Sequence, residues 1–160
     1  VTYVALMKDI ESKFLQSKAL WLVMHPCQSM GWEQDTLYPW KAAEAIRLAQ
    51  KIEYYLRPMK HKAKVVPDHL QCISHLSQYK NMQTQEDLVT YMRKYRLDSI
   101  VYCGFDYGIC IISEKHLGMA EVSKRTDYKL YLKHTLCSGP VDSNWHLGDE
   151  RTKEWGGKII

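Results

Sequence analysis

The sequence predicts an α/β fold, a three-layer α/β/α sandwich around a short and mainly parallel β-sheet. Apolar segments short enough to be strands alternate along the chain with longer segments of helical periodicity. Two strand-like segments, residues 19–24 and 99–103, are apolar at successive positions, which is typical of strands covered by helices on both faces. The length of 160 residues suits one hydrophobic core, so we expect a single Rossmann-like domain over residues 1–160.

The first helix is expected within residues 1–18, where apolar side chains recur at helical spacing. These side chains are Val4, Leu6, Met7, Ile10, Phe14 and Leu15. The apolar run of residues 19–24 follows and ends at His25 and Pro26, because proline has no N–H to donate to a sheet. An amphipathic helix that leads directly into a buried strand is therefore the expected start of the domain.

The middle of the chain alternates in the same way. A loop is expected over residues 27–40 and a helix over 42–56, followed by a short strand over 63–66. Thr84 and Asp87 have the spacing of a capping box, in which two residues bond each other's backbone amides, so a helix should begin there. That helix should lead into the second fully apolar strand.

The segment after this strand predicts a glycine turn and then a helix. Gly104 turns the chain, and Asp106 can cap a helix that continues to Leu117. Gly118 is a typical residue at which a helix stops. Residues 128–132 are the last strand candidate, so the sheet should contain at least four strands.

The composition excludes several classes of protein. The formal net charge is only +4, with 22 basic and 18 acidic residues interspersed, so no nucleic-acid partner is expected. No apolar run approaches the roughly 20 residues that span a bilayer, and charges interrupt the N-terminal segment, so neither a membrane partner nor a signal peptide is expected. The five cysteines are scattered and odd in number, which favours reduced thiols and a cytoplasmic location.

Cys110 gives the strongest local signal for chemistry. It stands about one turn into the helix after the second apolar strand, near the sheet edge where ligands bind in α/β folds. N–H groups and the positive end of the helix favour a thiolate there, so Cys110 is a candidate nucleophile. The alternative is that Cys110 is a small apolar residue packed among Ile109, Ile111 and Ile112.

The residues around Cys110 resemble the nucleophile segment of the isochorismatase-like cysteine hydrolases, which include nicotinamidases and N-carbamoyl amidohydrolases. The shared features are an apolar strand, Gly104, and a cysteine followed by an aliphatic residue at the start of a helix. Residues 19–26 resemble the family's first strand, and residues 128–132 resemble the strand after the nucleophile helix. The resemblance covers about residues 19–137 and implies an isochorismatase-like fold.

The resemblance implies a function as well as a fold. It implies hydrolysis of a small amide or related C–N bond in a small-molecule substrate, with Cys110 as the nucleophile. Backbone N–H groups of Tyr107, Gly108 and Ile109 would bind the oxyanion that forms during the reaction. No cofactor is expected.

Two departures from the family pattern make the site divergent. The family's Asp after the first strand is His25 here, and the family's Lys is not found, since Lys80 fits only with a shortened loop. Imidazole is a competent base for a thiol, so His25 can replace the Asp, or it is a strand-end histidine without a proton-transfer role. The chain is thus expected to be such a hydrolase or a catalytically degenerate member of the fold that serves as a binding or structural subunit.

A polar segment after the strand at residues 63–66 contains Asp68, His69 and His75. Some members of the resembled family hold a metal through Asp and His residues in a comparable place, and these side chains are suitable ligands. The spacing matches no family motif well. A solvated polar loop is the favoured interpretation, so no metal is expected.

The last segment, residues 138–160, shows no sustained helical or strand period and is expected to form an irregular tail. Its apolar side chains include Trp145, Trp155, Ile159 and Ile160, which are hard to leave in water. We therefore expect a homo-oligomer or a subunit of a larger assembly. The alternative is that the tail folds back over its own sheet.

Overall fold

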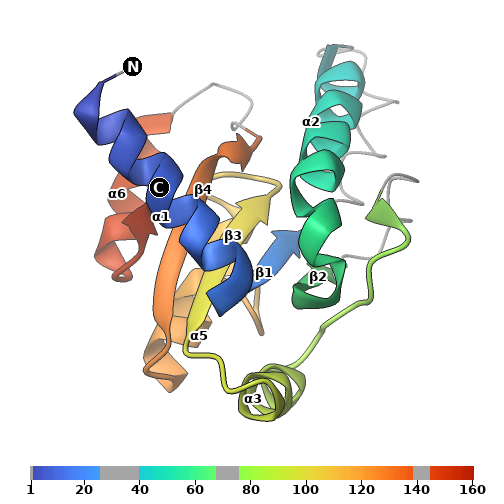
Figure 1. Ribbon diagram of the computed structural model, residues 1–160, viewed down its shortest axis with the longest axis vertical. Helices are drawn as coiled ribbons and strands as arrows, with labels where there is room; N and C mark the ends of the chain where they lie inside the picture. Colours follow the sequence, from blue (N-terminus) through green and yellow to red (C-terminus); the bar gives the residue numbers. More distant parts are fainter. Residues whose placement is uncertain (1, 26–39, 68–75, 139–144) are drawn as a thin grey trace.

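The computed structural model describes residues 2–25, 40–67, 76–138 and 145–160, which form a five-stranded sheet with helices on both faces (Figure 1). The strands are β1 (Ala19–Met24), β2 (Ala63–Val66), β3 (Ser99–Gly104), β4 (Lys129–Cys137) and β5 (Lys158–Ile159). Their order is β2-β1-β3-β4-β5, and each neighbouring pair is parallel. The predicted α/β sandwich is confirmed, with the two fully apolar strands, β1 and β3, adjacent to each other.

The helices divide between the two faces of this sheet. They are α1 (Tyr3–Lys18), α2 (Trp40–Leu56), the 3-10 helix η2 (Arg57–Lys62), α3 (Gln85–Lys94), α4 (Cys110–Ser113), α5 (Met119–Arg125) and α6 (Trp145–Glu154). Buried residues of α1 and α2 belong to one core cluster, and those of α3, α4 and α5 belong to the other. Figure 1 shows α1 and α2 on the near side of the sheet. Every described residue of β1 and β3 is buried as a result.

Strand β1 shows why a continuous apolar run suits the centre of this sheet. Trp21 and Val23 point into the core on the α1 and α2 side, whereas Leu20 and Leu22 point into the opposite core. All four are fully buried, and each such side chain contributes roughly 1.5–3 kcal/mol of transfer free energy. The indole N–H of Trp21 donates to the Leu15 carbonyl at 3.0 Å, which ties the end of α1 to the strand.

The helix predicted after Thr84 is present with both bonds of its capping box. The Thr84 hydroxyl accepts a hydrogen bond from the Asp87 amide at 3.0 Å, and the Asp87 carboxylate accepts one from the Thr84 amide at 3.3 Å. Asp therefore serves at this position as Glu or Gln usually does.

The prediction of a single helix after Gly104 is wrong, because the structure contains two short helices there, α4 and α5. Ile109, rather than Asp106, occupies the cap position of α4, which ends at Ser113. The Glu114 carboxylate then accepts a hydrogen bond from the Leu117 amide and turns the chain. Gly118 starts α5 instead of stopping a helix, and a Cβ at this position would lie 2.5 Å from the Glu114 amide nitrogen. The glycine is needed for this close approach.

The irregular tail predicted for residues 138–160 is also wrong for the part that the structure describes. Residues 145–154 form α6, and β5 pairs with β4 through Tyr131 and Lys158. Trp145 and Trp155 pack against the core on the α3 side, and Ile160 is 3% exposed. The apolar side chains of this segment are therefore covered by the chain's own domain, as in the alternative considered above.

Helix α1 is present as predicted, but its apolar stripe does not face the core. Leu15 and Ser12 are the buried residues of this helix. Val4, Met7 and Phe14 are instead exposed. The helix enters β1 without an intervening loop, so the direction of the strand fixes the rotation of the helix. Among the described residues, each helix is too short or too polar to cross a bilayer.

Candidate active site at the carboxyl edge of the sheet

The carboxyl ends of β1 and β3 bring the His25 and Cys110 segments to one edge of the sheet. Met24, the last residue of β1, pairs with Gly104, the last residue of β3. The Phe105 amide then donates to the Met24 carbonyl at 2.9 Å and continues the pairing by one residue. His25 follows the first strand directly, and Cys110 follows the second after a five-residue loop. Both therefore lie at the edge where ligands bind in open α/β sheets.

Gly104 allows the two strands to approach this closely. Its φ is 106°, and a Cβ at this position would lie 2.5 Å from the Met24 carbonyl oxygen. Any larger residue would therefore displace the loop that leads to Cys110. The next peptide bond, between Phe105 and Asp106, is cis.

His25 holds an unusual backbone conformation at the end of β1. Its φ is 43°, and its amide donates to the Val66 carbonyl of the neighbouring strand at 2.9 Å. The side chain is partly buried. Lys80 lies beyond β2, because Val65 pairs with Val23 on one side and with the Lys80 segment on the other. Two strand spacings, about 10 Å, thus separate the Lys80 backbone from β1.

Cys110 differs from the other described cysteines in its exposure. It is the first residue of α4 and is partly buried, and Ile111 and Ile112 are the residues that this helix buries. Cys103 and Cys137 are buried, and desolvation raises the pKa of both thiols. Of the three thiols that the structure describes, that of Cys110 is the most accessible to a substrate.

The three amides expected to bind an oxyanion are in the loop before Cys110. The Tyr107 amide donates to the Ser138 carbonyl at 2.9 Å, and the Ile109 amide donates to the Asp106 carbonyl at 3.2 Å. Gly108 lies between them with a φ of 82°. The Tyr107 and Ile109 amides thus already donate within the protein, and the Gly108 amide completes the set of three.

Tyr107 anchors this loop to α6, a contact that sequence reasoning missed. Its hydroxyl donates to the Asp149 carboxylate at 2.5 Å, and burial together with this bond raises the pKa of Tyr107. The His134 ring meets the Tyr107 ring edge-on at a centroid distance of 5.3 Å, and the Trp145 ring lies at the same distance. A Cβ on Gly148 would lie 2.5 Å from a carbon of the Tyr107 ring, so α6 can approach this closely only with glycine there.

Two further side-chain bonds fix the same loop. The Arg151 guanidinium donates to the Gly108 carbonyl at 2.7 Å. The Ser138 hydroxyl donates to the carboxylate of Asp106, which is buried, at 2.9 Å. The loop that precedes Cys110 is therefore held by Ser138, the residue after β4, and by α6, and not only by its own turn.

Comparison with known proteins gives matches at the level of structure alone. No protein-family model matches the sequence, and no curated protein matches it. The YcaC gene product from Escherichia coli, an octameric hydrolase of unknown specificity, is 9% identical with a TM-score of 0.57, covering 91% of this chain and 76% of its own. An isochorismatase-like hydrolase from Alkaliphilus metalliredigens is 14% identical to this chain with a TM-score of 0.55, and the match covers 89% of this chain and 94% of that one. The chain has the fold of the isochorismatase-like hydrolases.

A third solved structure of this fold is pyrazinamidase of Pyrococcus horikoshii in complex with zinc. It is 13% identical to this chain with a TM-score of 0.52, and the match covers 88% of this chain and 97% of that one. Among the residues described here, no group of three or more His, Cys, Asp or Glu side chains is placed to hold a metal ion. Asp68, His69 and His75 lie outside the described residues.

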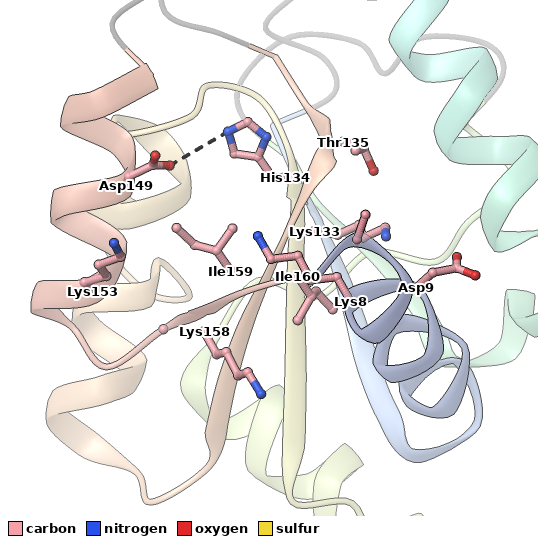
Figure 2. A pocket seen from close by; sticks show the side chains of 12 residues that line it. Lys8, Asp9, Lys133, His134, Thr135, Asp149, Lys153, Lys158, Ile159 and Ile160 are labelled. Carbon is pink, nitrogen blue, oxygen red and sulfur yellow. Dashed lines mark ion pairs between the residues drawn. The ribbon is translucent and has the colours of Figure 1, made fainter. Parts of the chain in front are cut away.

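On this isochorismatase-like fold, a groove of about 770 Å³ lies between α1, β4, α6 and β5 (Figure 2), and two of its lining residues, His134 and Asp149, contact Tyr107 of the loop before Cys110. Its lining residues are Ala5, Lys8, Asp9, Lys133, His134, Thr135, Asp149, Lys153, Gly157, Lys158, Ile159 and Ile160. Cationic side chains outnumber the two carboxylates, and Asp149 already accepts the bond from Tyr107. An excess of positive charge of this kind favours an anionic ligand over a cationic one.

An irregularity in β4 turns His134 toward this groove. Tyr102 pairs with Leu132 and Gly104 pairs with Cys137, so four residues of β4 oppose one residue of β3. His134 lies within this bulge, with its Nε2 atom 3.8 Å from the Asp149 carboxylate. Desolvation lowers the pKa of His134, and the nearby Lys8 lowers it further, whereas Asp149 opposes the shift. The imidazole is therefore mainly neutral at pH 7.

Proposed function

We propose that this protein is a divergent isochorismatase-like hydrolase that cleaves a small amide or a related C–N bond, with Cys110 as nucleophile and His25 as base. The observation that carries the proposal is the pairing of Met24 with Gly104, which brings the segments of both residues to one edge. The fold and the accessibility of the Cys110 thiol support it. The structural neighbours are hydrolases, and the same class of activity is proposed for this chain.

The proposed reaction has two halves and needs no group beyond the protein and water. His25 accepts the Cys110 proton, and the thiolate attacks the carbonyl carbon to form a tetrahedral oxyanion. The C–N bond then breaks, the amine leaves with the proton from His25, and a thioester remains on the sulfur. Water attacks the thioester, gives a proton to His25, and releases the acid; that proton returns to Cys110.

Backbone amides of the loop would stabilise the oxyanion in both halves of the reaction. Gly108 is the first candidate, and Tyr107 and Ile109 would have to share the hydrogen bonds they now donate to Ser138 and Asp106. A preorganised donor of this kind contributes about 2.7–4 kcal/mol of transition-state stabilisation in other enzymes.

The second candidate function is a catalytically degenerate member of the fold that binds a ligand without turning it over. The observations that favour it are the replacement of the family's Asp by His25 and the engagement of two of the three loop amides. In that case Cys110 would lack a functional base, and its thiol would titrate like that of an ordinary cysteine.

Alkylation of the native protein at a series of pH values separates these two functions. Iodoacetamide labelling followed by peptide mass spectrometry gives a rate for each cysteine. We expect Cys110 to react at pH 6 to 7 through a lowered thiol pKa, and His25→Asn to move its reactivity to higher pH. Cys103, which is 0% exposed, is an internal control that should stay unlabelled. An unreactive Cys110, or one unaffected by His25→Asn, overturns the proposed dyad.

Partners and location follow as parts of the same proposal. A small-molecule substrate, a cytoplasmic location with reduced thiols and a homo-oligomeric state are proposed. The three described cysteines form no disulfide, which agrees with a reducing compartment. The octameric state of the Escherichia coli YcaC gene product supports an assembly by analogy.

A further inference from the structure

Helix α1 presents an apolar face to solvent, although its other face packs on the domain. Six large apolar side chains of this helix are 45% to 75% exposed. They are Tyr3, Val4, Leu6, Met7, Ile10 and Phe14. In contrast, the face toward the domain buries Leu15 and the small polar residue Ser12, whose hydroxyl is hydrogen-bonded to Tyr55. The apolar face of this helix therefore points to solvent, whereas an ordinary surface helix turns its apolar face to the core.

We propose that this outward face pairs antiparallel with α1 of a second copy of this chain, which makes the protein a two-fold symmetric dimer. The proposal assigns an interface to the homo-oligomeric state proposed above, and it does not depend on the hydrolase activity. Four of the exposed residues, here called the α1 seam, are Tyr3, Met7, Ile10 and Phe14. They follow one another at intervals of four, three and four residues, which is the spacing of apolar positions in paired helices.

An antiparallel pairing makes the α1 seam complementary to itself. Tyr3 of one copy lies opposite Phe14 of the other, and Met7 lies opposite Ile10. Because a two-fold axis relates the copies, each of these contacts occurs twice. Aromatic rings thus meet aromatic rings at the ends, and flexible or branched aliphatic side chains meet at the centre. This arrangement matches how side chains fill paired-helix interfaces.

The charges beside the α1 seam favour the antiparallel direction. In a parallel pair, Lys13 of one copy would face Lys18 of the other, and like charges would repel. In the antiparallel pair Lys13 lies beside Leu6, where its methylene groups extend the apolar contact. Lys13 already pairs with Asp9 of its own helix at 3.2 Å, and Glu11 pairs with Lys158 at 2.9 Å. A second copy can therefore approach without burying an unpaired charge.

The size of the face is close to what a dimer needs. Six side chains of this size and exposure present on the order of 600 Å² per copy, against roughly 800 Å² per partner in a standard interface. Single apolar patches on monomers are typically about 300–600 Å², so this one is at the upper limit. Figure 1 shows α1 in front of β3 and β4, so this face is at the outside of the described molecule.

Sedimentation equilibrium of the full chain tests the proposal directly. We expect a dimer at micromolar concentrations, and Ile10→Glu should weaken it by roughly 100-fold or more because each dimer would bury two unpaired carboxylates. Tyr54→Glu is the matched control, since Tyr54 is 75% exposed on α2 and outside the α1 seam. Both variants should keep the circular dichroism and melting temperature of the monomeric domain, because both sites are exposed within one copy.

Disulfide trapping tests the direction of the pairing. A mixture of Tyr3→Cys and Phe14→Cys proteins should form a mixed disulfide, whereas neither variant should cross-link with itself, and the unmodified protein gives the background from native thiols. A monomer at every concentration, or a dimer that Ile10→Glu leaves unchanged, overturns the proposal. Self-cross-linking of Tyr3→Cys without the mixed product overturns the antiparallel arrangement.

Discussion

His25 has a backbone role and a proposed chemical role that mutation can separate. Its left-handed φ of 43° costs a non-glycine residue roughly 1–2 kcal/mol, although His tolerates the region better than β-branched residues do. The Val66 carbonyl holds its amide in place, so the conformation is fixed by the pairing of β1 with β2 rather than by the imidazole.

Replacing His25 with glycine should therefore leave the fold intact and remove the base. The free energy of unfolding should stay within about 1 kcal/mol of the native value, because relief of the left-handed conformation offsets the entropy that glycine adds to the unfolded chain. The reactivity of Cys110 near neutral pH should fall. Urea unfolding and thiol alkylation measure the two effects, and His25→Ala, which retains the strained φ, should lower both. A His25→Gly protein that alkylates like the native one would show that the imidazole is not the base.

Some residue positions could be predicted from the sequence and others could not. His25 and Cys110 follow two buried strands, and parallel strands end at a common edge, so their placement at that edge follows from local patterns. The partnership of Tyr107 with Asp149 spans 42 residues and left no periodic signal. The environment of His134 depends on the bulge in β4, which could not be predicted from any single residue of the sequence.

At the scale of elements, α6 stabilises the loop before Cys110 through side-chain contacts. It contributes Asp149 to the Tyr107 hydroxyl and Arg151 to the Gly108 carbonyl. The absence of a side chain at Gly148 allows the helix to lie against the Tyr107 ring. The helix is thus positioned by a few specific contacts rather than by a wide apolar stripe.

Gly148→Ala should weaken the packing of α6 against the loop before Cys110. In an open helix the change would stabilise by about 1 kcal/mol through helix propensity. Here the new methyl group would overlap the Tyr107 ring, and forced repacking of this kind costs about 1–3 kcal/mol. We therefore expect a net loss of stability and faster alkylation of the Cys110 thiol. Thermal melting checks the prediction, with Glu154→Ala as an exposed control on the same helix. A Gly148→Ala protein that melts higher than the native protein would contradict it.

The strands were easier to predict than the helices that cover them. A short run that is apolar at every position has one simple interpretation in an α/β chain, so β1 and β3 were predicted as buried strands. The helical period predicted α1 but not the direction of its apolar face, since the direct connection to β1 sets the rotation. Helix α6 was missed because its few apolar residues repeat too irregularly to give a period.

At the scale of the whole molecule, buried thiols and phenols should make the fold sensitive to alkali. Burial raises the pKa of Cys103 and Cys137, raises that of Tyr102 well above 10, and raises those of Tyr79 and Tyr91 to about 12. Above about pH 8.5 an unfolded thiol loses its proton, whereas the folded one keeps it. The folded state then binds more protons than the unfolded state, so stability falls as pH rises.

We expect the free energy of unfolding to decline from about pH 8.5 upward, more steeply once unfolded phenols titrate near pH 10. Each fully shifted group contributes about 1.4 kcal/mol per pH unit within its window. Lys64 and Lys133 have lowered pKa values, which oppose the decline below about pH 10.5, but the acidic groups are more numerous. Urea unfolding at several pH values measures the slope, and Cys103→Ala should reduce it between pH 8.5 and 10. A stability that is flat to pH 10.5 would contradict this account.

The central position of β1 has a consequence for synthesis of the chain. Both strands that flank it come later in the sequence, and β3 ends roughly 80 residues after β1 does. At typical translation rates of 5–20 residues per second, the apolar strand ALWLVM waits roughly 4 to 16 seconds on the ribosome before its second neighbour exists. During that interval the six consecutive apolar residues of β1 lack β3, one of the two strands that flank them. Nascent-chain chaperones should therefore bind at β1 and dissociate once residue 104 has left the exit tunnel.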